Sequence, residues 1–306
     1  MRYSDVFGFK SSRILLGTGY FGDGITEEES FAMMDKFCEM GGTHIDTARL
    51  YDDGRAEEIV GRWFADRKPE GVFVSTKGAY YDMDAKDTPR LTEADIRSDL
   101  EKSLKALKFD VVDFYWLHRD DENTPAGQII EIMNTLVKEG KIKKFGASNW
   151  TSKRIAEANA YAEEHGIIGF SASQIRFNPA YCLGERGGLV GMDDIEFEFY
   201  KKNNMPVAAY SSQAKGFFSK LAKGESVKNI IEGQFVSTAN LARLAKVIKL
   251  CKEMDKAPAV VVLGYLNSQP FFVSSVFSAS KVWQIEEDMG AQDMVFDKNV
   301  MASLEL

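Results

Sequence analysis

Residues 111–147 read VVDFYWLHRDDENTPAGQIIEIMNTLVKEGKIKKFGA, and this stretch contains one complete strand–helix–strand unit. Its two ends, residues 111–117 and 142–147, are short apolar runs of the length that buried strands have. Between them, Thr124 followed by Pro125 at the first helical position is typical of a helix start, and Gly140 is typical of a helix end. The unit therefore predicts two parallel strands that are joined by a right-handed crossover helix.

The same alternation of short apolar runs and amphipathic stretches continues along the whole chain. The apolar runs that read as strands are residues 13–16, 43–46, 72–76, 111–117, 142–147, 169–174, 206–210 and 271–277. Capping residues open the intervening helices: Thr26 with Glu29 for residues 26–40, Thr92 with Asp95 for the helix that follows, and Thr151 for residues 151–164. Later helices are expected over residues 193–202, 238–254, 258–266 and 281–289.

Eight strands that alternate with helices predict an α/β fold, a (β/α)8 TIM barrel that spans residues 1–306 as a single domain. An open, doubly wound sheet is the alternative. It is disfavoured because no Gly-x-Gly-x-x-Gly follows the first strand, where the dinucleotide site of that fold would need it.

Composition excludes several classes of partner. The chain has 306 residues with a net charge of -8, which argues against nucleic acid and against an anionic membrane surface, because both require a basic face. No apolar run reaches the ~18 residues of a membrane span. The N-terminus lacks the apolar core of a signal peptide, and the three cysteines stand far apart. A cytoplasmic location is the resulting expectation.

Polar and titratable residues follow the predicted strands at their carboxyl ends, where parallel barrels carry their functional groups. These residues are Asp46, Tyr51, Lys77, His118, Ser148, Asn149, Gln174, Tyr210 and Ser211. A carboxylate, a phenol, an ammonium and an imidazole suit proton transfer to a carbonyl oxygen. We expect the ammonium of Lys77 to lower the pKa of the Tyr51 phenol, and Asp46 to hold Lys77 within roughly 4 Å.

Four segments, in order, resemble motifs of the aldo-keto reductase superfamily. They are residues 44–51 (HIDTARLY), 75–77 (STK), 117–120 (LHRD) and 146–150 (GASNW). The resemblance implies a catalytic set of Asp46, Tyr51, Lys77 and His118, in which Tyr51 donates the proton during reduction. It also implies that a nicotinamide dinucleotide is bound, with its carboxamide held by Ser148, Asn149 and Gln174 and its ring stacked on Tyr210.

The same resemblance indicates where the rest of the dinucleotide binds. Phosphate contacts are expected from Ser211, Gln213, Lys215 and Gly216, where the sequence departs from the commoner Tyr-Ser-Pro-Leu-Gly. At the end of the eighth strand, Ser278, Ser280, Lys281 and Gln284 stand where relatives often carry basic residues that bind the 2′-phosphate of NADP. Asp288 stands where an Asn often contacts adenine. The resemblance favours NADP(H) over NAD(H), and Lys281 is the cation expected nearest the 2′-phosphate.

Five aromatic residues are candidates for the wall of a substrate pocket: Tyr20, Phe21, Tyr80, Trp116 and Trp150. Core packing is the alternative for Trp116. The expected substrate is a small carbonyl or alcohol, while its identity, the direction of the reaction, the choice between NADP and NAD and the oligomeric state stay open. No metal site is expected, because the chain has only three histidines and no His-x-His pair.

Two other functions fit parts of the pattern. A barrel aldolase could use Lys77 as a Schiff-base nucleophile, but it would give the Ser148–Asn149 pair and the Tyr210 loop no function. A non-catalytic dinucleotide-binding protein, such as a redox-sensing, channel-associated subunit, could share the same scaffold.

Overall fold

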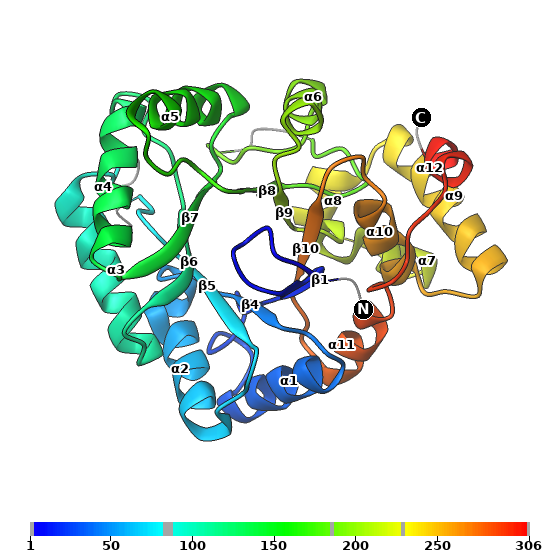
Figure 1. The fold of residues 1–306 in the computed structure, drawn as a ribbon. Coiled ribbons are helices and arrows are strands. Elements are labelled where there is room, and N and C mark those ends of the chain that lie inside the picture. The colour runs from blue at the N-terminus through cyan, green and yellow to red at the C-terminus, as the bar shows by residue number, and fades with distance from the viewer. Residues whose placement is uncertain (1–2, 82–87, 184–186, 228–229, 305–306) are drawn as a thin grey trace.

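The computed structural model describes residues 3–81, 88–183, 187–227 and 230–304, and its centre is a closed barrel in which every neighbouring pair of strands is parallel. The order around the barrel is β10-β3-β4-β5-β6-β7-β8-β9. The strands are β3 Ile14–Gly17, β4 His44–Asp46, β5 Phe73–Gly78, β6 Val112–Leu117, β7 Ile142–Ser148, β8 Ser173–Arg176, β9 Val207–Tyr210 and β10 Val273–Phe277. The predicted (β/α)8 barrel is confirmed, and Figure 1 shows it along its axis.

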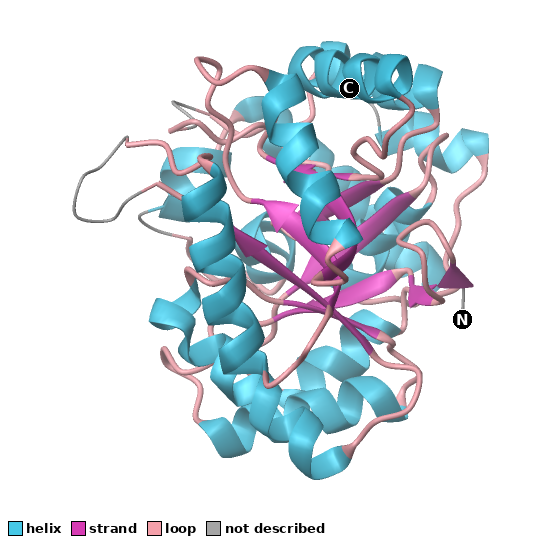
Figure 2. Cartoon of the chain, turned by 60° about the vertical axis from the view of Figure 1, so that its left-hand side comes forward, coloured by secondary structure: helices cyan, strands magenta, loops and turns pink. Residues whose placement is uncertain are grey.

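Helices surround the barrel, with a further group on the side where β9 and β10 lie (Figures 1 and 2). The outer ring is α1 Glu27–Glu39, α2 Arg55–Arg67, α3 Glu93–Leu107, α4 Ala126–Lys138, α5 Ser152–His165, α6 Asp194–Asn203, α10 Pro258–Asn267 and α11 Val282–Met289. The further group is α7 Phe217–Ala222, α8 Ile230–Phe235, α9 Thr238–Met254 and α12 Lys298–Leu304, and two short 3-10 turns are η1 Tyr51–Gly54 and η2 Ala214–Gly216.

Helix starts follow the capping signals in the sequence with one exception. Thr26 and Glu29 form the predicted capping box, and the side chains of Thr92 and Thr151 each accept a bond from a backbone N–H of the first turn. At α4 the prediction was wrong by one residue. Pro125 is the N-cap instead of the first helical residue, because the Thr124 hydroxyl donates to Asp121 (2.7 Å) and leaves the helix without a side-chain cap.

The sixth strand begins later than residues 169–174 predicted, at Ser173. The backbone of Phe170 bonds to the side chain of Asn159 on α5, and that of Ile168 bonds to Asn134 on α4, so the start of this segment is tied to helices. Backbone bonds to β7 begin only at Ser171, whose N–H donates to the Phe145 carbonyl at 3.1 Å. Helix α2 was not predicted, although it buries Ile59, Val60 and Trp63 at helical spacing.

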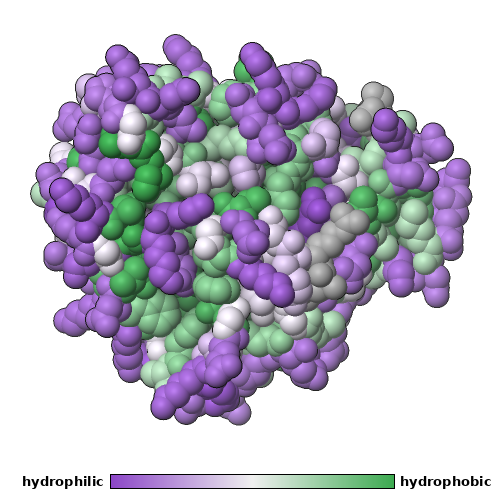
Figure 3. Space-filling view, in the orientation of Figure 1, coloured by the Kyte–Doolittle hydropathy of each residue, from purple (hydrophilic) through white to green (hydrophobic). Residues whose placement is uncertain are grey.

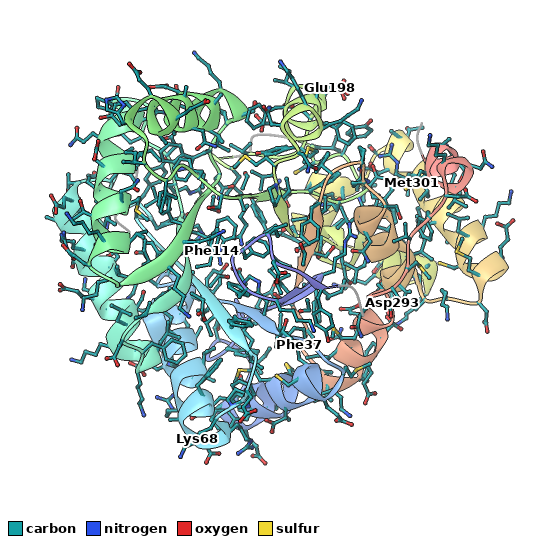
Figure 4. The ribbon with its side chains drawn as sticks, in the orientation of Figure 1. Phe37, Lys68, Phe114, Glu198, Asp293 and Met301 are labelled. Carbon is teal, nitrogen blue, oxygen red and sulfur yellow. The ribbon has the colours of Figure 1, made fainter. Side chains whose placement is uncertain are left out.

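The amino end of the barrel is closed by the N-terminal hairpin, in which β1 Tyr3–Ser4 pairs antiparallel with β2 Ser11–Ser12. Phe7 in its loop is fully buried, and its ring lies 5.3 Å from Phe114 and 6.1 Å from Trp116 on β6. Figure 1 shows this loop across the middle of the barrel, and Figure 4 places Phe114 there while Lys68 and Glu198 lie on the outer ring. The carboxyl ends of the strands therefore form the end that is left for a site.

Hydrophilic side chains gather around the periphery of the face seen in Figure 3, and hydrophobic residues show between them. Within the described ranges, no helix has both the length and the apolar character that crossing a membrane requires.

Candidate active site and cofactor groove

The base of the site is an ion pair that is shielded from solvent. Lys77 on β5 and Asp46 at the end of β4 are each 1% exposed, and the Lys77 Nζ donates to Asp46 Oδ2 at 2.6 Å. The second carboxylate oxygen accepts bonds from Ser75 Oγ (2.6 Å) and Gln174 Nε2 (3.2 Å). The predicted contact of Lys77 with Asp46 is present, and a carboxylate with three donors is rigidly held.

Tyr51 lies directly against this pair. The Lys77 Nζ also donates to the Tyr51 hydroxyl at 3.2 Å, and it lies 4.8 Å from the centre of the ring. Burial raises the pKa of Tyr51, and the positive charge of Lys77 lowers it but does not cancel the effect of burial. Lys77 thus acts on the pKa of Tyr51 in the expected direction, but burial, which the sequence did not reveal, outweighs it: Tyr51 is a protonated phenol at neutral pH.

Lys77 stays protonated. Burial by itself lowers its pKa, but the charge of Asp46 and the contact with Tyr51 outweigh burial, so that the pKa lies above its ordinary value. An ammonium that is held in this way cannot act as a free amine nucleophile.

His118 follows β6 and faces the same space. Its ring lies 6.3 Å from that of Tyr51 and 5.0 Å from that of Tyr80. Burial, together with the charges of Lys77 and Arg119, places the pKa of His118 well below its ordinary value, so the imidazole is neutral. Its Nδ1 is buried and meets no partner in the described part of the chain. A neutral imidazole can donate one hydrogen bond to a substrate oxygen.

The residues predicted to hold the nicotinamide lie together beside this cluster. Ser148 and Gln174 are almost fully buried on neighbouring strands β7 and β8, where their backbones are in register. The Asn149 side chain donates to Ser148 Oγ (3.2 Å) and to the His118 carbonyl (3.3 Å), and it accepts from the Tyr210 hydroxyl (2.7 Å). Amide and hydroxyl groups that converge in this way suit a planar carboxamide.

A groove of about 510 Å³ runs from the ends of β9 and β10. Its lining residues are Tyr20, Asp23, Gly24, Ile25, Ser211, Ser212, Gln213, Lys215, Gly216, Lys220, Val276, Phe277, Ser278, Ala279, Ser280 and Gln284. Neither Lys215 nor Lys220 has a carboxylate partner among the side chains that are described, those of residues 3–81, 88–183, 187–227 and 233–304. Gly216 has φ 83°, a conformation that favours glycine and turns the loop tightly into α7. Unpaired ammonium groups beside hydroxyls fit the phosphates of a dinucleotide.

An adjoining hollow of about 200 Å³ contains Asp288. This carboxyl is 3% exposed and accepts a bond from Gln213 Nε2 at 2.7 Å. Burial raises the pKa of Asp288 to about 7, against the opposing effect of the Gln213 bond. Gln213, which was expected to contact phosphate, and Asp288, which was expected near adenine, thus lie together in the hollow beside the groove.

One predicted cofactor residue lies elsewhere. Lys281 is exposed, does not line the groove and pairs with Glu29 on α1 at 3.1 Å. It was the cation expected at the 2′-phosphate, and it is engaged by the helix beside it instead. Ser280 and Gln284 do line the groove, but the Gln284 side-chain oxygen accepts from the Ser280 N–H (2.7 Å) and hydroxyl (3.1 Å), so it caps α11.

Three of the predicted pocket aromatics are core residues. Trp116 is fully buried inside the barrel, and Trp150 is fully buried against Phe170 at 4.9 Å. Phe21 is 1% exposed and packs in the core. A side chain without accessible surface cannot touch a substrate, so these assignments are wrong. Tyr20 lines the groove, and the ring of Tyr80 lies 5.0 Å from that of His118, so the role of these two residues in a substrate pocket stays a prediction.

The sequence did not reveal three cationic residues at this end of the barrel. Lys220 lies on the short helix α7, outside any recognisable motif, and reaches the groove only because η2 turns the chain. Arg119 follows β6 and Arg176 is the last residue of β8. In the sequence, only their positions shortly after His118 and Gln174 could have indicated that they lie near the site.

Comparison with known proteins agrees with this geometry. The model of the aldo/keto reductase family matches residues 13–305. The chain is 29% identical to an uncharacterized oxidoreductase, YrpG, of Bacillus subtilis (strain 168), over 97% of this chain and 92% of the relative. It is 27% identical to a probable voltage-gated potassium channel subunit beta of Oryza sativa subsp. japonica, over 94% and 89% of the two chains. It is also 27% identical to the aldo-keto reductase yakc [NADP(+)] of Schizosaccharomyces pombe, over 87% and 78%.

Proposed function

Because the chain belongs to the aldo-keto reductase family, we propose that it is an NADP(H)-dependent enzyme that interconverts an aldehyde or ketone and an alcohol, with Tyr51 as proton donor in reduction. The observation that carries this proposal is the contact of a protonated phenol with a buried ammonium–carboxylate pair beside a neutral imidazole.

The proton chemistry follows from these four side chains. A carbonyl oxygen that gains negative charge needs a donor at hydrogen-bond distance, and the Tyr51 hydroxyl keeps its proton at neutral pH. Lys77 stabilises the phenolate that remains after transfer, because its ammonium lies 3.2 Å from the phenol oxygen. Asp46 holds Lys77 in place, and His118 can donate to the same substrate oxygen.

The groove suits the dinucleotide that this reaction requires. A bound nicotinamide supplies the hydride, and Ser148, Asn149 and Gln174 would orient its carboxamide. Lys215 and Lys220 would bind phosphates. Lys220, as a second cation in the groove, supports NADP(H) over NAD(H). The NADP(+) in the name of the fission-yeast relative supports the same choice.

The two alternative functions fare differently. The aldolase is disfavoured, because Lys77 is protonated and in contact with Asp46. A non-catalytic, channel-associated role finds support in the name of the rice relative. The complete set of Asp46, Tyr51, Lys77 and His118 favours catalysis, and turnover of any aldehyde would decide between the two.

The test is Tyr51→Phe, assayed with NADPH and the neutral substrate 4-nitrobenzaldehyde. Positioned acid catalysis contributes about 10²–10⁴-fold, so kcat should fall by roughly that factor. Binding of NADPH, followed by quenching of tryptophan fluorescence, should change by less than about threefold, which is under ~1 kcal/mol.

Tyr161→Phe is the matched control, because it removes a phenol hydroxyl whose bond partner is the exposed Glu131 on α4. It should leave kcat unchanged. Near wild-type turnover of Tyr51→Phe, with chemistry as the rate-limiting step, would assign the proton to another group, and His118 would be the first candidate.

A further inference from the structure

Two buried guanidinium groups lie at the mouth of the barrel, next to the proton-transfer residues. Arg119 follows His118 at the end of β6 and is 5% exposed, and Arg176 ends β8 two residues after Gln174 and is 7% exposed. Neither forms an ion pair with a carboxylate in the described ranges, whereas the equally buried Arg154 pairs with Asp120 at 3.0 Å. A buried charge is costly unless it is paired or hydrogen-bonded, so each of these guanidinium groups needs polar partners from the protein or from a ligand.

Among the described residues, Arg119 contacts neutral groups. Its guanidinium donates to the Gly188 carbonyl (2.6 Å) and to the Tyr80 hydroxyl (3.0 Å), and it lies 4.9 Å from the ring of Tyr80 and 5.5 Å from that of Tyr81. Its Nε is buried and has no partner in the described part of the chain. The group is thus held in a fixed orientation with donor capacity to spare.

Within residues 3–81, 88–183 and 187–227, no carboxylate pairs with Arg119. The carboxylate of Asp46 is bound to Lys77, and His118 is neutral. Arg176 contacts the Cys182 sulfur at 2.5 Å, which adds a second positive charge without a carboxylate. The positive charge at the mouth of the site is therefore available to a negatively charged molecule.

The ring of Tyr80 lies close to both Arg119 and the catalytic candidate His118. Its centre lies 5.0 Å from the ring of His118 and 4.9 Å from the Arg119 guanidinium carbon. The Tyr80 ring thus separates Arg119 from the position where Tyr51 and His118 would bind a carbonyl. A small molecule with a carbonyl at one end and a charged group at the other could span this separation.

We propose that Arg119 selects carbonyl substrates that carry an anionic group, a carboxylate or a phosphate, by binding that group with a charge-assisted hydrogen bond. This inference rests on the proposed reductase function. Arg119 would be a specificity residue, and Arg176 would reinforce the attraction from β8, two strands further around the barrel, without contacting the substrate.

The experiment compares matched substrates in wild type, Arg119→Met and Arg119→Lys. 4-Carboxybenzaldehyde is compared with 4-nitrobenzaldehyde, and glyceraldehyde 3-phosphate is compared with glyceraldehyde, so that the two pairs separate carboxylate from phosphate recognition. Wild type should show the higher kcat/KM for the anionic member of at least one pair. Arg119→Met should raise the KM for that substrate roughly ten- to a hundredfold and leave the KM for its neutral partner within about threefold. Arg119→Lys should keep part of the preference, because it keeps the charge but not the fork geometry.

A purely structural role for Arg119, as a link between Tyr80 and Gly188, gives a different pattern. Both members of a pair would then lose kcat/KM equally in Arg119→Met. Tyr80→Phe, which removes the bonded hydroxyl but keeps the ring, would reproduce part of that loss. Equal losses of this kind in a folded Arg119→Met would overturn the proposal. A wild type that prefers the neutral member of both pairs would also overturn it, and this result does not depend on whether Arg119→Met folds.

Binding without turnover separates this inference from the proposed function. Benzoate and inorganic phosphate are titrated into wild type and Arg119→Lys with NADPH present, and the melting temperature is followed. An Arg119-dependent rise in a protein that reduces no aldehyde would uphold the anion site and reject the reductase. Reduction of neutral aldehydes without any anion effect would do the reverse.

Discussion

Replacing Lys77 by methionine removes one half of the buried ion pair while keeping the length of the side chain. Removal of one partner of a buried pair typically costs 3–5 kcal/mol, because the other charge is left without compensation. Asp46 would keep its bonds from Ser75 (2.6 Å) and Gln174 (3.2 Å), which places the expected loss at the lower end, roughly 3 kcal/mol. Since native domains have about 5–15 kcal/mol of stability, Lys77→Met should fold and be measurable.

The assay is urea unfolding followed by tryptophan fluorescence, with the free energy of unfolding taken by linear extrapolation. Asp46→Asn and the double variant Asp46→Asn/Lys77→Met complete a cycle. The double variant contains no unpaired charge, so its loss should be smaller than the sum of the two single losses by roughly 1–3 kcal/mol.

The matched control is Lys143→Met. The Lys143 Nζ also lies 2.6 Å from a carboxylate, that of Asp113, but its side chain is 61% exposed. Water screens that pair, so the expected loss is below about 1 kcal/mol. If Lys77→Met cost no more than Lys143→Met, or if the single losses were additive, burial would not be what makes the Asp46–Lys77 pair important.

Two further predictions concern the groove. Lys220→Ala should weaken NADPH binding by roughly tenfold and leave NADH binding within about threefold, as measured by fluorescence quenching. The control Lys281→Ala should change the binding of neither cofactor, because Lys281 pairs with Glu29. Equal weakening of NADPH and NADH binding in Lys220→Ala would reject a 2′-phosphate role for Lys220. Burial raises the pKa of Asp288 to about 7 in the folded protein, so the wild type should lose stability as the pH rises through 7, and Asp288→Asn, which cannot ionise, should not. The free energy of unfolding of Asp288→Asn relative to wild type should therefore be higher at pH 8 than at pH 5, by at most roughly 3 kcal/mol, because each pH unit between 5 and the pKa of about 7 contributes about 1.4 kcal/mol. The same stability difference between the two proteins at both pH values would contradict the assignment.

The sequence by itself determined the barrel and the residues around the ion pair. Eight apolar runs with helices between them leave few topologies, since parallel strands need crossovers of one hand. Asp46, Lys77 and His118 could be placed together from sequence because each directly follows or ends a strand, and the strand ends of a closed parallel barrel share one rim. The predicted start of the sixth strand was too early because the Asn159 side chain on α5 binds the backbone of Phe170, a contact that only the tertiary structure shows.

Only the tertiary structure decided burial, pairing and charge balance. Trp116 and Trp150 have the residue type of a pocket wall, but packing encloses them completely. Lys281 stands at the expected place in the chain and is bound by Glu29, whereas Lys220 reaches the groove from a helix without a motif. The net pKa of Tyr51 likewise depends on how far burial exceeds the effect of Lys77. These outcomes depend on which side chains meet in the folded protein, and a local pattern of residues along the chain does not determine contacts between distant segments.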